Sequence, residues 1–198
     1  MPLTLLVLRL TVGLLLAIHG AQKLFAWCGG CGLRPTASWL STMGFRPAIA
    51  WAILAGVLEF GGGLLFALGL FSPLGSLMIG ASMLTAIAKV HWPKLWATTG
   101  GFELPLVNLA VVIAVGLAGG PGALALDSVY GTALPSRAFL VGGLVVVMGW
   151  LFALFTSTLT AVSDPLLEQD PPTGHLSTLE WQLRHEPHPG SPEHEHKG

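Results

Sequence analysis

The stretch that decides the fold is IAWAILAGVLEFGGGLLFALGLFSPLGSLMIGASMLTAIAKV, residues 49–90, in which two apolar runs flank the pair Ser72-Pro73. A helix needs about 20 mainly apolar residues to cross the hydrocarbon core of a membrane, and each run approaches or exceeds that length. The residue before a proline is biased away from the helical region, so the chain is expected to turn at Ser72. The stretch therefore predicts two antiparallel membrane helices, residues 49–71 and 74–90.

Three further apolar stretches, residues 3–25, 104–118 and 139–159, are similar in character. The first contains Arg9 and His19 and lacks a basic segment before it, so we interpret it as a retained helix and not as a cleaved signal. Only 10% of the chain is charged, against about 25% in soluble domains. The sequence predicts an all-α, polytopic transmembrane helix bundle in a lipid bilayer. No basic cluster interleaved with aromatic residues indicates binding to nucleic acid.

Composition changes near residue 163, beyond which Pro, Glu and His replace most apolar residues. Such a segment cannot bury enough apolar surface to order itself, so residues 163–198 are expected to form a mostly disordered tail. Leucines at helical spacing within it leave open a short helix on the membrane surface. Its histidines imply no fixed ligand geometry, and no metal site is predicted. The chain thus divides into a four-helix membrane domain (1–127), an additional transmembrane helix (128–162) and this tail.

Helices that alternate in direction place residues 26–48, 91–102 and the tail on one membrane face, called face B. The N-terminus and residues 120–136 lie on the opposite face, called face A. Most basic residues of the membrane part belong to face B: Lys23, Arg34, Arg46, Lys89 and Lys94. Because cytoplasmic loops carry an excess of Lys and Arg, face B is expected to be cytoplasmic.

Glu59 is the most informative polar residue, because a charged side chain at the bilayer centre costs about 2.5 to 3.5 kcal/mol on insertion scales. It lies about 15 Å from face B along its helix, and His19 lies about 9 Å from the same face. His19, Gln22 and Lys23 are three and four residues apart, so they project from one side of the first helix and are able to face Glu59. Three more polar residues lie near face B: Lys89, His91 and Glu103.

Three interpretations of this polar cluster stay open. In the first, Glu59 pairs with Lys23 or His19 and locks the bundle, while Lys89 and Lys94 extend to the headgroups. In the second, the cluster forms a pocket for a polar head such as a quinone ring, in which His19 and Glu59 are catalytic and exchange protons. The other polar residues of the cluster then line the pocket. In the third, Glu59 titrates during proton-coupled transport.

At face A, Arg9 lies about a turn and a half into the first helix, and Asp127 follows the fourth. We expect these two residues to form a structural clamp. The second helix also carries small residues that permit close packing against a neighbouring helix: Gly56, Gly61, Gly62 and Gly63.

Two cysteines form a C-x-x-C pair in the segment Trp27-Cys28-Gly29-Gly30-Cys31. In such pairs a neighbouring cation lowers the pKa of a thiol. The βαβ pattern that a thioredoxin-like interpretation needs is absent, and two cysteines alone do not complete a zinc site. Three interpretations of Cys28 and Cys31 stay open: a redox-active dithiol or disulfide, a structural disulfide, and passive cysteines in a Gly-rich loop.

An ordered set of segments extends over residues 3–127: Leu8-Arg9-Leu10 with HGAQKLF (19–25), EFGG (59–62), residues 83–91, FELPL (102–106) and residues 119–127. This set resembles the DoxX family of small bacterial membrane proteins, whose relatives include subunits of thiosulfate:quinone oxidoreductase. The resemblance implies a four-helix bundle in the bacterial cytoplasmic membrane. It also implies a redox or oxidative-stress association through partner proteins. The fifth helix, the tail, Cys28 and Cys31 lie outside this pattern.

We therefore expect a membrane component of a quinone- or thiol-linked redox or oxidative-stress system, with soluble redox proteins as partners and a quinone as candidate cofactor. If the protein is an enzyme, it is an oxidoreductase subunit of the thiol- or thiosulfate:quinone type. Two alternatives are a non-catalytic scaffold for soluble redox enzymes and a small-molecule or proton-coupled carrier. The sequence is also compatible with a homo-oligomer.

Overall fold

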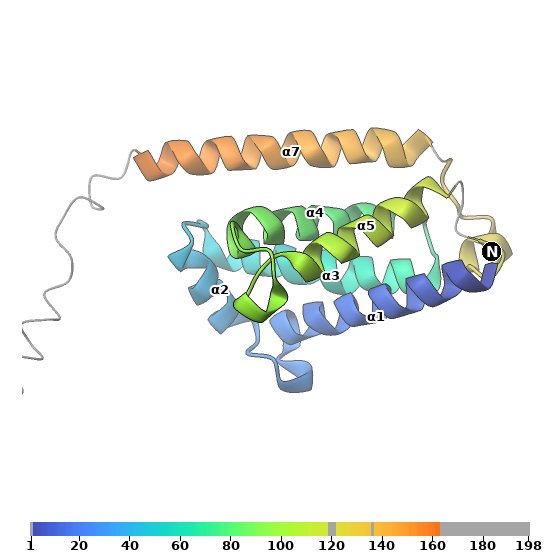
Figure 1. The fold of residues 1–198 in the computed structure, drawn as a ribbon, viewed down its shortest axis with the longest axis horizontal. Coiled ribbons are helices and arrows are strands. Elements are labelled where there is room, and N and C mark those ends of the chain that lie inside the picture. The colour runs from blue at the N-terminus through green and yellow to red at the C-terminus, as the bar shows by residue number, and fades with distance from the viewer. Residues whose placement is uncertain (1, 119–121, 136, 163–198) are drawn as a thin grey trace, which may run out of the picture. The chain divides into compact units, whose positions relative to one another are not determined.

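The computed structural model describes residues 2–118, 122–135 and 137–162, and these contain helices and no strand. The principal helices are α1 (Pro2–Phe25), α3 (Ala48–Leu68), α4 (Leu74–Thr85) with its continuation η2 (Ala86–His91), α5 (Glu103–Leu117) and α7 (Arg137–Val162) (Figure 1). They coincide with the five predicted apolar stretches, so the all-α bundle is confirmed. The predicted tail, residues 163–198, lies outside the described residues.

Three of these helical segments are long and apolar enough to cross a membrane: Leu3–Phe25, Ala48–Leu68 and Leu74–His91. The helix α5 has 15 residues, or about 22 Å, which is less than the roughly 30 Å of a hydrocarbon core. Large apolar side chains on the outer surfaces of α1 and α3 are exposed, Leu14 and Ile53 among them. Contact with lipid accounts for this exposure.

The turn between α3 and α4 begins at Gly69, three residues earlier than the sequence predicted. Gly69 adopts a left-handed conformation, with φ 62°, and the amide of Leu70 donates a hydrogen bond to the carbonyl of Leu65 at 3.0 Å. This is the usual way in which a glycine ends a helix. The helix α4 then begins at Leu74, directly after the predicted turn pair.

Glycines bring the backbones of α1 and α3 into contact. A Cβ atom on Gly20 would lie 2.2 Å from the amide nitrogen of Phe60, and one on Gly63 would lie 2.5 Å from the carbonyl oxygen of Gly13. The small-residue surface of α3 serves a second neighbour as well, because Gly62 faces Met78 of α4. Close packing through glycine is the arrangement expected of membrane helices.

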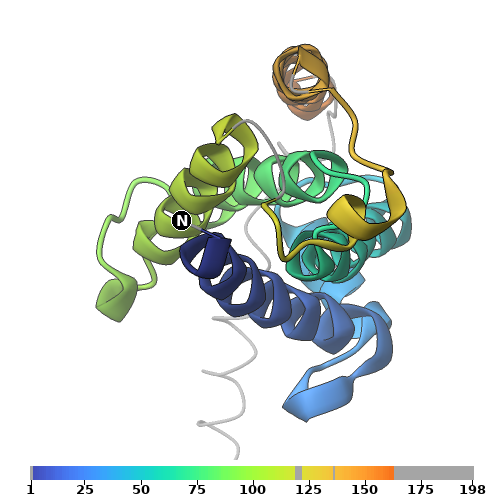
Figure 2. The same cartoon turned by 90° about the vertical axis from the view of Figure 1, so that its right-hand side faces the viewer.

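One apolar core joins α1, α3, α4 and α5, whose arrangement is seen end-on in Figure 2. Its buried members come from all four helices: Val12, Leu16, Phe66, Ile79, Met83, Val112 and Val115. Contacts between α7 and this group of helices include Phe139 against Gly116 and Leu77 against Gly142.

Four short helices lie in segments that the sequence analysis treated as loops. They are η1 (Trp27–Gly29), α2 (Leu33–Thr42), η3 (Ala97–Thr99) and α6 (Leu126–Tyr130). The helix α2 forms a second small core with α3, in which Ala37 and Leu40 pack around Ala52. This packing, together with the segment 92–102, encloses the space beside the second half of α1.

Candidate functional site

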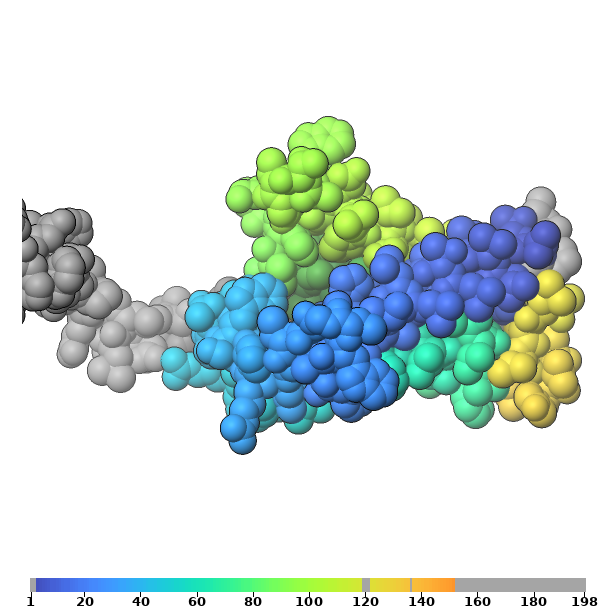
Figure 3. Space-filling view, turned by 90° about the horizontal axis from the view of Figure 1, so that it is seen from below, coloured from blue at the N-terminus to red at the C-terminus, as the bar shows by residue number. Residues whose placement is uncertain are grey.

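A cavity of about 510 Å³ lies between α1, α2, α3, the α4–η2 segment and α5. Figure 3 shows the surface hollowed between α1 and the segment that leads into α5. Most of the wall is apolar and includes Trp39 and Trp51. The polar residues that line it are His19, Lys23, Thr36, Glu59, Ser82, Thr85, His91 and Asn108.

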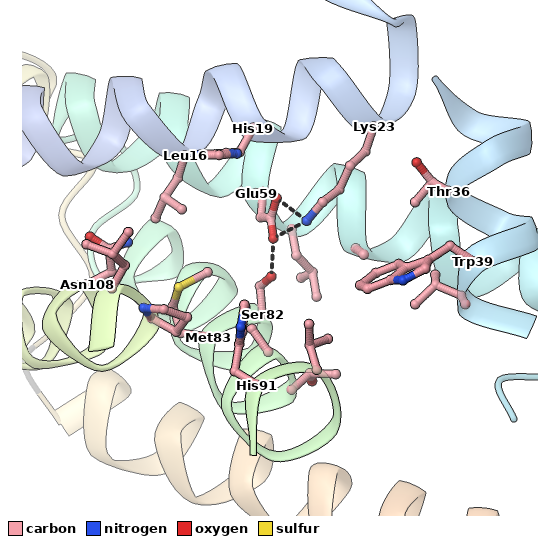
Figure 4. Close-up of a pocket in the computed structure, with 18 of the residues that line it drawn as sticks. Leu16, His19, Lys23, Thr36, Trp39, Glu59, Ser82, Met83, His91 and Asn108 are labelled. Carbon is pink, nitrogen blue, oxygen red and sulfur yellow. Dashed lines mark hydrogen bonds and ion pairs between the residues drawn. The ribbon is translucent and has the colours of Figure 1, made fainter. Parts of the chain in front are cut away.

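Glu59 is the centre of the polar wall, and Lys23 is its ion-pair partner (Figure 4). The Nζ atom of Lys23 donates to both carboxylate oxygens of Glu59, at 2.5 Å each. The hydroxyl of Ser82 donates a third hydrogen bond, at 2.8 Å, to Oε1 of Glu59. Hydrogen bonds of this kind, with a charged donor or acceptor, are the stronger ones in proteins. They compensate the burial of Glu59, whose exposed fraction is 4%.

Three different helices position this triad. Lys23 lies in the last turn of α1, where a cation interacts favourably with the helix dipole. Glu59 projects from the middle of α3 and Ser82 from α4. The sequence analysis considered Lys23 and His19 as partners of Glu59 and missed Ser82. The available signal was a hydroxyl inside an apolar helix, but Ser76 and Thr85 on the same helix share that signal, so only the rotation of α4 singles out Ser82.

His91 reaches the cavity from the end of η2, a stretch of wider π-helical turns that continues α4. Its Nδ1 atom lies 2.7 Å from the carbonyl oxygen of Gly100. Glu103 holds the same loop from outside the cavity, because its Oε2 accepts a hydrogen bond from the amide of Ala97 at 3.0 Å. The segment 92–102 is therefore a braced wall of the site.

The structure separates the predicted site residues into two groups. His19, Lys23, Glu59 and His91 line the cavity, whereas Gln22, Lys89 and Glu103 do not. Instead, the Nε2 of Gln22 donates to the carbonyl of Cys28 at 3.1 Å. Four polar lining residues were not predicted for the site: Thr36, Ser82, Thr85 and Asn108.

Cys28 and Cys31 are free, exposed thiols outside the cavity. The candidate thiol pair and the candidate pocket are therefore two separate features of the chain.

In the described residues, no group of three or more His, Cys, Asp or Glu side chains is arranged to hold a metal ion.

Arg9 and Asp127 lie at the opposite end of the bundle, each with an exposed fraction of 2%. The Nη2 of Arg9 donates to the carbonyl of Leu124 at 3.0 Å, and the charges of Arg9 and Asp127 attract each other. The carboxylate of Asp127 accepts hydrogen bonds from the amides of Phe71 and Ser72, at 2.8 and 2.7 Å. These contacts tie α1 and α6 to the turn between α3 and α4.

The environment of Asp127 acts on its pKa in two opposing ways. Burial raises the pKa, while hydrogen bonds from Thr132, Ser72 and Phe71 lower it. The combined effect of the hydrogen bonds exceeds that of burial, so the pKa of Asp127 falls below its ordinary value of 3.8. Donors that stabilise the charged form of a carboxyl have this effect.

Residues 4–92 match the model of the DoxX family. The protein contains a DoxX domain. The matched range includes α1 to η2 and with them Lys23, Glu59, Ser82 and His91. Segments 102–106 and 119–127, which the sequence analysis included in the resemblance, lie outside this range. No curated protein and no solved structure matches the chain.

The DoxX domain and the apolar helices together establish a membrane protein. The cavity begins inside this domain and is completed by residues that follow it, Leu104, Pro105 and Asn108 of α5 among them. The DoxX domain thus provides the ion pair and His91, and α5 provides the opposite wall.

Proposed function

We propose that this DoxX protein binds a quinone in the cavity beside Glu59, as a multi-pass component of a redox system in the bacterial cytoplasmic membrane. The observation that carries the proposal is a cavity of about 510 Å³ with apolar walls and a few converging polar groups. Small-molecule sites have this character and volumes of about 300 to 1,000 Å³. A quinone has the matching chemistry, because its ring is apolar and its two carbonyl oxygens accept hydrogen bonds.

Donors for a quinone carbonyl are available in the wall. A lysine ammonium has three N–H groups, of which Lys23 gives two to Glu59, so the third is available to a ligand oxygen. The side-chain amide of Asn108 supplies two more N–H groups on the α5 side. Trp39 and Trp51 add aromatic surface, which favours offset stacking with a flat ring.

The position of the cavity also suits a ligand dissolved in the bilayer. One wall is formed by α1, which is long and apolar enough to cross the membrane. The hollow opens beside α1, where a lipid-soluble molecule has direct access (Figure 3). The exposed thiols lie outside this space, so the geometry favours a quinone link over a thiol link.

Binding of a short-chain quinone to the purified protein in lipid nanodiscs tests the proposal. Quenching of the tryptophan fluorescence reports occupancy, because Trp39 and Trp51 line the cavity. Ala86→Phe fills the cavity from η2 and is expected to weaken binding at least tenfold. Ala110→Phe, at an exposed position of α5 outside the cavity, is the matched control and should bind as the wild type does.

Equal binding by wild type and Ala86→Phe would contradict a quinone site in this cavity. If no quinone binds and the protein instead retains soluble redox enzymes, the scaffold alternative is favoured. A change in solute transport in Glu59→Gln, in protein that still folds, would favour the carrier alternative.

A further inference from the structure

One hydrogen bond determines which ring nitrogen carries the proton in a neutral His91. A carbonyl oxygen only accepts hydrogen bonds, so the 2.7 Å contact with Gly100 requires a proton on Nδ1. A neutral imidazole carries one N–H, and its other nitrogen then has a lone pair. No described residue of the chain makes a hydrogen bond to Nε2. His91 therefore presents an acceptor to the cavity that it lines.

The carbonyl of Gly100 is a rigid partner for this ring. Gly100 adopts a left-handed conformation, with φ 79°, and its amide donates to the carbonyl of Ala97 at 3.0 Å. The amide of Phe102 donates to the carbonyl of Lys94 at 2.9 Å, and the ring of Phe102 stacks on Trp92 with centroids 5.8 Å apart. These contacts hold the loop in place, so the orientation of His91 persists when the cavity is empty.

We infer that His91 accepts a hydrogen bond from a hydroxyl on the bound molecule, so that the cavity prefers a hydroquinone or another phenol to an analogue without a ring hydroxyl. This inference rests on the proposed function. It assigns to His91 the distinction between the quinone and the hydroquinone. A quinone carbonyl would place a second acceptor against the Nε2 lone pair. A hydroquinone hydroxyl provides the donor that the lone pair lacks.

Three hydroxyls of the wall, those of Thr36, Ser82 and Thr85, donate their protons within the chain, so they also present lone pairs, but a hydroxyl oxygen is a weaker acceptor than an imidazole nitrogen. The carboxylate of Glu59 is occupied by Lys23 and Ser82. Asn108 carries both donors and an acceptor, so it is able to serve either redox form. Lys23 offers only donors, which suit a carbonyl oxygen and a hydroxyl oxygen alike. Of the two imidazoles that line the cavity, His91 is the one that a carbonyl partner fixes as an acceptor, so it is the group expected to separate a hydroxyl from a carbonyl or an ether.

The test compares three ligands in nanodiscs under anaerobic conditions: a short-chain quinone, its hydroquinone and the dimethyl ether of that hydroquinone. The wild type is expected to bind the hydroquinone about three- to tenfold more tightly than the ether, the ratio given by one net hydrogen bond. The ether is bulkier than the hydroquinone, so the ratio has to be measured in matched variants as well.

Two substitutions at His91 separate the hydrogen bond from bulk. In His91→Asn, the amide nitrogen replaces Nδ1 and keeps the bond to Gly100, but nothing replaces Nε2. The ratio of the affinities for hydroquinone and ether should then fall to the value that the larger size of the ether alone produces. In His91→Gln, the longer side chain brings an amide oxygen near the place of Nε2, and part of the preference should return.

The outcomes distinguish the two proposals. If none of the three ligands binds the wild type, the proposed quinone site itself is wrong. If they bind but the wild type does not prefer the hydroquinone, or if His91→Asn keeps the full preference, the role of His91 is overturned and the quinone site stands.

Discussion

The ammonium of Lys23 on α1 lies 2.5 Å from both carboxylate oxygens of Glu59 on α3. This pair couples two membrane helices inside the cavity wall, where Glu59 is almost completely buried. The cost of placing a carboxylate at this depth is offset by the cation and by the hydroxyl of Ser82. The same pair therefore contributes to stability and shapes the candidate site.

Removal of the cation should destabilise the protein strongly. Lys23→Met leaves a buried charge with Ser82 as its remaining donor, and breaking a buried pair in this way costs about 3 to 5 kcal/mol. The double variant Lys23→Met/Glu59→Gln should recover most of this loss, because no charge is left behind. Unfolding in detergent micelles measures both effects. A single variant as stable as the wild type would show that the ion pair contributes nothing.

Loss of the Ser82 hydroxyl should have a smaller effect in the same assay. A hydrogen bond to a charged group contributes about 1.5 to 3 kcal/mol, and Ser82→Ala removes one of those to Glu59. Ser76→Ala is the matched control, because Ser76 is also buried on α4 and its hydroxyl makes no hydrogen bond within the described residues. Equal losses in the two variants would argue against a specific role for Ser82.

The close contact between α1 and α3 should not tolerate a methyl group. A Cβ on Gly20 would lie 2.2 Å from the backbone of Phe60, so Gly20→Ala forces the helices apart and should cost about 1 to 3 kcal/mol. Gly149→Ala adds the same methyl on α7, where no described atom lies within 4 Å, and should be close to neutral. The difference between their unfolding free energies tests the packing.

Asp127 should make stability depend on pH. Its pKa is lowered in the folded protein, so the stabilisation is present above 3.8, its ordinary pKa, and is lost as pH falls through the lower folded value. Asp127→Asn removes this part of the dependence. The difference in unfolding free energy between wild type and variant should therefore be largest near neutral pH and shrink in acid. A difference independent of pH would contradict the lowered pKa.

Labelling of the cysteines should reveal the orientation in the membrane. Cys28 and Cys31 are exposed and free, so a membrane-impermeant maleimide should react with them from the side where they lie. The positive-inside rule places that side in the cytoplasm, and we expect labelling in inside-out vesicles and not in intact cells. Cys28→Ser/Cys31→Ser is the unlabelled control. Labelling of intact cells would reverse the predicted orientation.

Which predicted site residues meet in the cavity depended on the rotation of each helix. Spacing alone placed His19, Gln22 and Lys23 on one side of α1, but Gln22 turns to the loop of Cys28 while the other two face the cavity. Residues three and four positions apart still differ in direction by tens of degrees around a helix. That difference is enough to separate a wall residue from a loop contact.

The sequence by itself determined the number, position and apolar character of the principal helices, because length and hydrophobicity are local properties of each segment. It also identified Glu59 as a buried charge that needs a partner. Only the tertiary structure decided that Lys23 and Ser82 supply the hydrogen bonds and that the Gly100 carbonyl orients His91. Those contacts join residues 9 to 36 positions apart. They depend on helix rotation, glycine packing and loop closure, which no single segment encodes.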